Sequence, residues 1–289
     1  MSSSPDRIIA FQGAPGAYSD LACREVHPEL ETLACETFED TFAAVQERRA
    51  ALAMLPIENS VAGRVADIHH LMPQSGLAII GEHFQRVSHD LLALPGATLE
   101  GLKTVRSHVH ALSQCRAFIR KHGLAPQVAA DTAGAAAEIS LRQDKTVAAI
   151  ASALAGEIYG LQSLAQNIED EEHNTTRFLV MAREPLPLPK GCAKAITTFV
   201  FRVRNVPAAL YKAMGGFATN GVNMTKLESY MLGGRFTATQ FYADVEGQPD
   251  DPPVKLALEE LRFFSREVKI LGTYPAHPFR AEAAQTGSD

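Results

Sequence analysis

Short apolar runs alternate with amphipathic segments along the first half of the chain. Runs of aliphatic residues indicate buried strands at 8–11, 33–35, 51–55, 104–105, 128–129 and 147–150. Helical periodicity lies between them, at 16–27, 39–49, 111–122 and 132–142. Buried strands that alternate with helices are typical of parallel sheets, so this part of the chain is predicted to be an α/β unit.

The segment 77–94 mixes polar and apolar positions midway along this α/β unit. We expect it to cross from one lobe to another, with the chain returning near Phe178. The first lobe would comprise about residues 7–85 with 172–183, and the second about 86–171. A cleft between two such lobes is the usual place for a small ligand.

A proline-rich stretch marks the end of the α/β unit and predicts a stiff linker at 184–193. Beyond it the patterns indicate a strand, a helix, two strands, a helix and a strand, at 196–203, 207–219, 222–231, 235–245, 252–266 and 268–273. Gly233 and Gly234 would turn the hairpin between the two central strands. This βαββαβ order is ferredoxin-like, so a second domain is predicted at 194–279, followed by a disordered tail at 280–289.

Composition and charge exclude some classes of partner. The 289 residues carry a net charge of −6 without a block of like charges, so no basic face for nucleic acid is expected. No apolar run approaches a membrane span, and the N-terminus lacks the segments of a signal peptide, so no membrane partner is expected. The four cysteines form no C-x-x-C pair, so we expect no zinc site and a cytoplasmic protein.

The five residues 174–178 place a hydroxyl beside a guanidinium at the start of an apolar run. The guanidinium of Arg177 can hold a carboxylate through two parallel hydrogen bonds. The hydroxyl of Thr176 can donate to a leaving oxygen without carrying charge itself. Together they suit a small acid that must lose a hydroxyl. The alternative is a strand start with a surface arginine.

Two strand ends carry further candidates. The glycine-rich turn after the first strand would point backbone amides at an anion from a helix N-terminus, near Gly16 and Ala17. An ordinary βα turn is the alternative. Glu58, Asn59 and Ser60 follow the third strand, where open α/β sheets contact their ligands. Asn59 or Ser60 can also cap the next helix, and both interpretations can hold at once.

The first helix of the second lobe carries two more polar candidates. Ser107 precedes this helix and is expected to cap it, and Gln114 lies about two turns in. His108 and His110 are two residues apart rather than four, so the segment predicts no metal site.

Other polar residues are expected to lie outside any site. His69, His70 and His89 are interpreted as surface or core histidines. The acidic run 169–172 is interpreted as a solvated loop ahead of residues 174–178.

Five segments, taken in order, resemble the motifs of prephenate dehydratases. They read F-Q-G-x-x-G-A-Y-S, P-I-E-N-S-x-x-G, S-H-x-x-A-L-x-Q-C, D-T-A-x-A-A and N-x-T-R-F, and the resemblance covers nearly the whole chain. It implies a two-lobed fold like the type II periplasmic binding proteins over residues 7–183. It also implies a carbon–oxygen lyase that converts prephenate to phenylpyruvate, with loss of water and carbon dioxide, in phenylalanine biosynthesis.

The resemblance and the chemistry of the residues together assign roles to particular residues. Thr176 would be the catalytic residue, donating to the leaving hydroxyl. No cofactor or metal is expected, because aromatisation of the ring drives the reaction. Arg177 and the glycine turn would hold the carboxylates, and neutral groups would contact the rest of the substrate. The implied substrate-binding residues are Asn59, Ser60, Ser107, Gln114, Arg177, Phe178, Gly16 and Ala17.

The second domain resembles the family's ACT domain, which binds phenylalanine. Two departures weaken the match: the family's G-A-L is Ala208-Ala209-Leu210 here, and its E-S-R-P ends in Tyr230-Met231. Feedback inhibition is nevertheless expected, and pairing of ACT domains implies a homodimer or homotetramer. The implied effector residues are Ala208, Ala209, Leu210, Asn223, Met224, Thr225, Leu227, Glu228 and Ser229.

Two other functions stay open. Arogenate dehydratases carry out the same chemistry on the aminated substrate. A non-enzymatic two-lobed protein that senses amino acids would have the same fold, because a fold does not fix function. The chain begins almost at the first predicted strand, so no fused chorismate mutase domain is expected.

Overall fold

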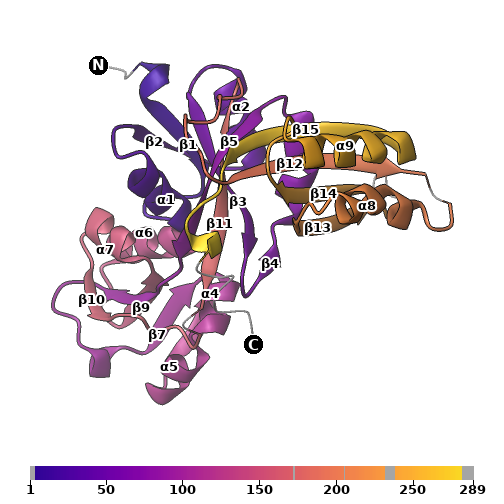
Figure 1. Ribbon diagram of the computed structural model, residues 1–289. Helices are drawn as coiled ribbons and strands as arrows, with labels where there is room; N and C mark the ends of the chain where they lie inside the picture. The colour runs from indigo at the N-terminus through magenta and orange to yellow at the C-terminus, as the bar shows by residue number, and fades with distance from the viewer. Residues whose placement is uncertain (1–3, 172, 205, 232–237, 282–289) are drawn as a thin grey trace. The chain divides into compact units, whose positions relative to one another are not determined.

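A computed structural model describes residues 4–171, 173–204, 206–231 and 238–281 (Figure 1). The chain divides into two compact units. The first unit comprises Met1–Ile68 and His83–Phe178, and the second comprises His69–Glu82 and Leu179–Asp289. In the described residues, no helix is both long enough and apolar enough to cross a membrane.

The first lobe of the first unit is built on a mainly parallel sheet. β1 lies between β2 and β3, parallel to both, and β11 lies beside β3. The predicted burial is confirmed for β1, in which Ile9, Ala10 and Phe11 are almost fully buried, and for the middle of β3, but β2 is mostly half-buried or exposed. The elements are η1 (Pro5–Arg7), β1 (Ile8–Gln12), α1 (Tyr18–Val26), β2 (Glu31–Cys35), α2 (Phe38–Gln46), β3 (Leu52–Asn59), β4 (Gly63–Arg64), α3 (Ala66–Leu71) and β11 (Thr175–Ala182).

The second lobe has its own sheet, in the order β10-β6-β9-β7-β8. β7 runs parallel to β8 and β9, whereas β6 runs antiparallel to β9 and β10. Small and aliphatic residues such as Leu91, Val105 and Ile150 form its core. The elements are β6 (Asp90–Ala93), η3 (Leu99–Gly101), β7 (Thr104–Ser107), α4 (Val109–Gln114), α5 (Arg116–Lys121), β8 (Ala125–Val128), α6 (Thr132–Arg142), β9 (Val147–Ala151), α7 (Ala153–Tyr159) and β10 (Gln162–Ala165).

Two chain segments connect the lobes. β5 (Ala78–Arg86) leads into residues 87–89, which enter the second lobe at β6, and the chain returns through the residues before β11. The two segments are hydrogen-bonded: the N–H of Val87 donates to the carbonyl of Asn174 at 2.8 Å, and that of Ile168 to the carbonyl of His89 at 3.0 Å. The predicted crossing between two lobes is therefore present.

Three details of the second lobe differ from the prediction. The helix expected at 111–122 is interrupted at Cys115, because the Asp170 carboxylate accepts from the N–H groups of Arg116 and Ala117 and starts a new helix. The strand expected at 128–129 ends at Val128. The solvated acidic loop is only partly solvated, since the Glu169 side chain is 3% exposed; residue 172 lies outside the described residues.

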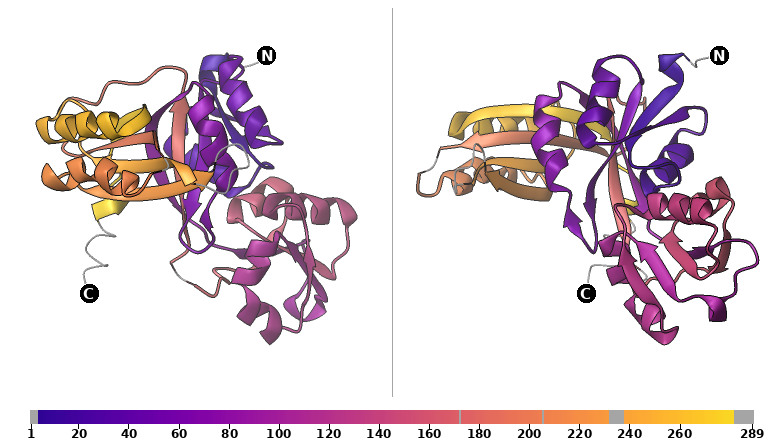
Figure 2. Two further views of the ribbon diagram at one scale, coloured as in Figure 1. Left: turned by 90° about the vertical axis from the view of Figure 1, so that its right-hand side faces the viewer. Right: turned by 180° about the vertical axis from the view of Figure 1, so that it is seen from behind.

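The second unit has the predicted βαββαβ order. Its antiparallel sheet runs β13-β14-β12-β15, and β5 joins β15 in parallel at Gly272. α8 and α9 lie side by side on one face, over a core that includes Phe199, Phe217 and Leu261 (Figures 1 and 2). The remaining elements are η2 (Met72–Gln74), β12 (Ala195–Val203), α8 (Ala209–Thr219), β13 (Met224–Met231), β14 (Ala238–Glu246), α9 (Pro252–Phe264) and β15 (Ser265–Pro275).

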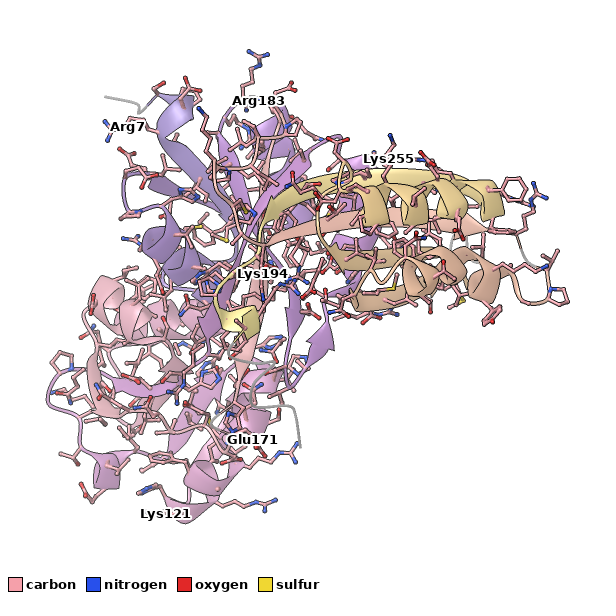
Figure 3. All side chains as sticks on the ribbon, viewed as in Figure 1. Arg7, Lys121, Glu171, Arg183, Lys194 and Lys255 are labelled. Carbon is pink, nitrogen blue, oxygen red and sulfur yellow. The ribbon has the colours of Figure 1, made fainter. Side chains whose placement is uncertain are left out.

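The C-terminal end of the second unit departs from the prediction of a tail beginning at residue 280. Arg280 donates from Nε and Nη2 to the Glu82 carboxylate, at 2.6 and 2.8 Å, and from Nη1 to the Thr225 hydroxyl at 3.2 Å. Unlike Arg280, the side chains of Arg7 and Lys121 project away from the ribbon (Figure 3). The predicted glycine hairpin turn at 233–234 lies outside the described residues.

Candidate active site

Asn59 and Thr176 meet where the end of β3 lies beside the start of β11. The Nδ2 group of Asn59 donates to the Thr176 hydroxyl oxygen at 2.9 Å. Asn59 also forms the local turn considered above, because its Oδ1 accepts from the backbone N–H groups of Val61 and Ala62 at 2.9 and 2.8 Å. Two residues predicted separately, 117 positions apart, are thus brought into contact.

The contact leaves the Thr176 hydroxyl able to donate. Its oxygen accepts from Asn59, and among the described residues its proton has no hydrogen-bond acceptor. Thr176 is half-buried at the start of β11. A hydroxyl whose oxygen is held in this way presents its O–H to whatever occupies the space next to it.

Gln114 and Asn174 extend this contact toward the second lobe. Asn174 is buried; its Oδ1 accepts from Asn59 at 2.8 Å, and its Nδ2 donates to Oε1 of Gln114 at 3.0 Å. Gln114 is the last residue of α4. A row of amide groups therefore links the two lobes, and none of them carries a charge.

His89 and Tyr18 complete the row. His89 Nε2 lies 3.0 Å from Gln114 Oε1, and its Nδ1 lies 2.9 Å from the Tyr18 hydroxyl. Burial lowers the pKa of His89, so its ring is neutral near pH 7. Burial, with the Glu169 carboxylate nearby, holds the pKa of Tyr18 well above its ordinary value. The interpretation of His89 as a surface or core residue missed its place in the row, because only the crossing segment puts it there.

The anion site predicted at the glycine turn is not supported. The N–H of Gly16 donates to Asp20 Oδ2 at 2.8 Å, and that of Ala17 to the Ala14 carbonyl at 3.0 Å. Gly16 instead connects the two lobes, because its carbonyl accepts a hydrogen bond from the Ser152 hydroxyl at 2.5 Å. Its φ of 87° is a backbone conformation that glycine adopts more easily than residues with a side chain. A Cβ at Gly16 would also collide with Ala155.

Arg177 and Phe178 are both almost fully buried. Arg177 is 3% exposed, donates from Nη1 to Glu58 Oε1 at 3.0 Å and lies over the ring of Phe84. Phe178 is a core residue, 1% exposed. The geometry therefore favours Arg177 as a brace between β3 and β11 rather than as the predicted carboxylate clamp or as a surface arginine.

Two serines also differ from expectation. Ser107 is fully buried and donates to the Ile150 carbonyl at 2.6 Å, so it neither caps α4 nor faces a cleft; His108 caps that helix. Ser60 is exposed, donates to the His173 carbonyl and accepts from the N–H of Thr175. Both hydroxyls thus hold backbone in place.

In the second unit, the predicted effector residues lie at the start of α8 and along the edge strand β13, with Ala208 and Asn223 directly before these elements. Ala209, Leu210 and Met224 pack against one core, and the side chain of Leu227 is 42% exposed. Ala208, at the start of α8, has a φ of +60°, which is the left-handed conformation that glycine adopts most easily. A glycine at this position would adopt the same conformation without the steric cost that alanine carries.

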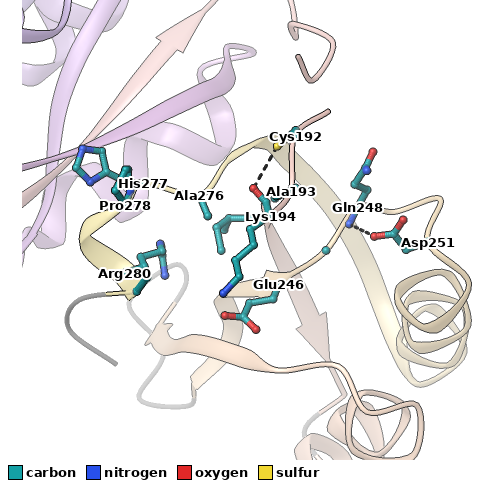
Figure 4. Close-up of a pocket in the computed structure, with 14 residues that line it drawn as sticks. Cys192, Ala193, Lys194, Glu246, Gln248, Asp251, Ala276, His277, Pro278 and Arg280 are labelled. Atoms are coloured by element: carbon teal, nitrogen blue, oxygen red, sulfur yellow. Dashed lines mark hydrogen bonds between the residues drawn. The ribbon is translucent and has the colours of Figure 1, made fainter. Parts of the chain in front are cut away.

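A cavity of about 400 Å³ lies elsewhere in the second unit, between the start of β12 and the C-terminal turn (Figure 4). Lys194, Glu246, His277 and Arg280 are among its lining residues, and none of the predicted effector residues is. Across the described ranges, no group of three His, Cys, Asp or Glu side chains is placed to hold a metal ion.

Fold and site together define a two-lobed α/β protein that has a row of neutral amide and hydroxyl groups where its lobes join. A family model for prephenate dehydratase matches residues 9–186. The chain belongs to the prephenate dehydratase family, as the ordered motifs predicted.

Three similar proteins show how the descriptions of family members differ. A Komagataeibacter europaeus protein described as a bifunctional N-acyl-homoserine lactone acylase/prephenate dehydratase is 57% identical, over 95% of this chain and 98% of its own. Arogenate dehydratase 2 of Petunia hybrida is 38% identical, over 93% and 71%. The crystal structure of an Arthrobacter aurescens prephenate dehydratase in complex with L-Phe is 29% identical, with a TM-score of 0.83, over 97% and 98%.

Proposed function

We propose that this protein converts prephenate to phenylpyruvate, and that Thr176 is its catalytic residue. The observation that carries the proposal is the Asn59–Thr176 contact, which occupies the hydroxyl oxygen and leaves its O–H to donate. The substrate must lose a ring hydroxyl, and a neutral donor can stabilise the negative charge that develops on that oxygen.

The proposed step balances without a redox partner. The ring C–O bond breaks and its electron pair leaves with the oxygen, which takes up a proton from solvent and departs as water. The bond to the ring carboxylate breaks at the same time, and its electron pair completes the aromatic ring as carbon dioxide leaves. Thr176 donates a hydrogen bond to the departing oxygen, help of a kind typically worth about 10²–10⁴ in rate.

Neutral surroundings suit this chemistry. A strong cation beside the leaving carboxylate would stabilise the charge that has to move into the ring. The Gln114 side-chain NH₂ has no acceptor among the described residues, and its Oε1 is held on two sides. We assign this NH₂ as a second neutral donor to substrate. Asn59 acts on the substrate through Thr176.

Prephenate and arogenate differ in one group, a keto oxygen in place of an ammonium. The 38% identical Petunia hybrida relative is described as an arogenate dehydratase, so arogenate is the alternative substrate. Comparing kcat/KM of the purified protein for the two substrates tests the proposal. A value for prephenate at least equal to that for arogenate supports it; no turnover of either refutes it.

A second candidate activity comes from the 57% identical relative, whose description includes N-acyl-homoserine lactone acylase. Such an activity would hydrolyse the amide bond and release a fatty acid and homoserine lactone. Incubating the protein with decanoyl-homoserine lactone and detecting free homoserine lactone by mass spectrometry tests it. Parallel assay of Thr176→Ala would show whether the same site is used.

We also propose that residues 194–279 form an ACT domain, that 7–183 form the catalytic domain, and that phenylalanine inhibits a homodimer or homotetramer. The ferredoxin-like strand order supports an ACT domain, and the Arthrobacter aurescens relative is described in complex with L-Phe. Isothermal calorimetry with L-phenylalanine, together with light scattering, tests binding and assembly. A lack of both a heat signal and inhibition at saturation would refute the effector role.

A further inference from the structure

The hydrogen bonds of the amide row have a fixed direction, which starts at Asn59. Because Asn59 Oδ1 accepts from two backbone N–H groups, its Nδ2 must be the end that faces Asn174 and Thr176. Backbone amides cannot reverse, so this orientation does not depend on any other side chain.

The orientation of Asn59 in turn fixes which atoms of the next residues donate and accept, as far as His89. Asn174 must present Oδ1 to Asn59, so its Nδ2 faces Gln114 and must meet Oε1. The same Oε1 lies 3.0 Å from His89 Nε2. A carbonyl oxygen only accepts, so His89 Nε2 must carry a hydrogen. The tautomer of the histidine is thus set by residues of the first lobe.

The other ring nitrogen faces Tyr18. In the neutral ring Nδ1 is an acceptor. The Tyr18 hydroxyl donates to the Ser88 carbonyl at 2.5 Å and lies 2.9 Å from Nδ1, so its one hydrogen is shared between these two acceptors. Glu169 accepts from the backbone N–H of His89 at 2.8 Å, and Asp90 follows in β6. Protonating His89 would add a hydrogen at Nδ1 and leave the Nε2–H in place.

We propose that His89 is a positioning residue, whose Nε2–H holds Oε1 of Gln114 so that the Gln114 NH₂ is directed to substrate. Tyr18 orients the ring from its other side. This inference rests on the proposed dehydratase function. Gln114 is held by two donors, from Asn174 and from His89, and losing the second would let its amide rotate.

Three substitutions separate the two ring nitrogens. Gln places an amide near the position of Nε2, Asn places one near Nδ1, and Leu provides neither. We expect His89→Asn and His89→Leu to lower kcat roughly tenfold to hundredfold with KM changed less, because a misplaced contact costs about that much. His89→Gln should stay within about threefold of wild type, a rescue that a purely structural histidine would not show.

Tyr18→Phe should lower kcat less than His89→Leu, and Tyr159→Phe is its matched control. The Tyr159 hydroxyl donates to the Pro15 carbonyl at 2.9 Å, a backbone contact on the same turn but outside the row. It should leave kcat unchanged. Equal losses in all three His89 variants with intact folding, or no loss in any, would overturn the inference.

Nitrogen-15 spectra of histidine-labelled wild type give a second reading that does not require activity. The resonances missing in His89→Gln identify His89, and we expect the neutral Nε2–H tautomer. An Nδ1–H tautomer would overturn the inference whatever the kinetics of the variants show. A wild type that turns over neither prephenate nor arogenate would refute the proposed function instead, and the tautomer would still decide the inference.

Discussion

Two buried polar clusters, one in each unit, use opposite chemistry. In the first unit the row from Tyr18 to Thr176 is made of amides, hydroxyls and a neutral imidazole. In the second unit the Glu82 carboxylate, fully buried, receives two bonds from Arg280 and one from the N–H of His277. Asp244, also fully buried, lies 3.6 Å from Arg280.

The difference lies in what each cluster leaves for a ligand. In the charged cluster, Arg280 and the N–H of His277 donate to the Glu82 carboxylate, and a further Arg280 N–H donates to the Thr225 hydroxyl, which fixes the C-terminal turn against β5. The neutral row has a Thr176 proton and a Gln114 NH₂ with no acceptor among the described residues. Both residues are half-buried, so these two donors are open to a ligand that accepts hydrogen bonds.

The largest free-energy effect is expected from breaking the charged cluster. Arg280→Ala would leave the Glu82 carboxylate buried without its cation and lower the free energy of unfolding by about 3–5 kcal/mol. Urea unfolding followed by circular dichroism measures it. The control is Arg49→Ala, which breaks an exposed pair with Glu47 and should cost about 1 kcal/mol or less. Equal losses would remove the distinction between buried and exposed pairs.

The neutral row can be broken by replacing one donor atom, the Nδ2 of Asn59, with an oxygen that accepts instead. Asn59→Asp keeps the acceptor for Val61 and Ala62 but replaces the donor to Thr176 with a carboxylate oxygen. Thr176 would then donate to the introduced carboxylate rather than to substrate, and kcat should fall about 10²–10³-fold. Steady-state kinetics measure this. Asn167→Asp, which changes an amide on the returning segment, is the control; a drop of the same size there would point to charge alone.

Sequence reasoning predicted the fold further than the site. Asn59 and Thr176 were identified because they stand at the end and at the start of predicted strands, whereas Gln114 was placed inside a longer predicted helix and was assigned through the family resemblance. Asn174 and His89 were missed as contacts, since only the paired crossing segments bring them between Asn59 and Gln114. The break at Cys115 was missed for a similar reason: its cause is Asp170, which is distant in the sequence.

The second unit shows the same limit. A polar composition predicted a tail at residue 280, but no local pattern reveals that Arg280 reaches Glu82 on β5. The replacement of glycine by Ala208 was visible in the sequence, whereas its positive φ was not. Patterns with periods of two or 3.6 residues predict elements, and partners far apart in sequence fall outside them.

A smaller effect is expected from the strained start of α8. Ala208→Gly should raise the free energy of unfolding by about 1 kcal/mol, because an alanine at positive φ carries a steric cost that glycine avoids. Denaturant unfolding tests it. Ala209→Gly, one residue into the helix, should instead lower it by about 0.5–1 kcal/mol. A loss in both variants would show that Ala208 is not strained.

The smallest effect is a pH dependence of stability. Because the pKa of His89 is lowered in the folded state from its ordinary 6.5, the unfolded chain binds the proton first as pH falls. Stability should therefore decrease as pH drops below about 6.5 toward the folded-state pKa. Unfolding curves at several pH values give the free energy of unfolding as a function of pH, and in His89→Gln the decrease below about pH 6.5 that His89 causes should be missing. An identical slope in the variant would contradict it.

The central claim is that the Thr176 hydroxyl donates to the leaving oxygen, and Thr176→Ala against Thr175→Ala tests it most directly. With matched melting temperatures, prephenate turnover by Thr176→Ala should fall about 10²–10⁴-fold with little change in KM, while Thr175→Ala stays near wild type. Near-normal turnover by Thr176→Ala, or an equal loss in Thr175→Ala, would contradict the account.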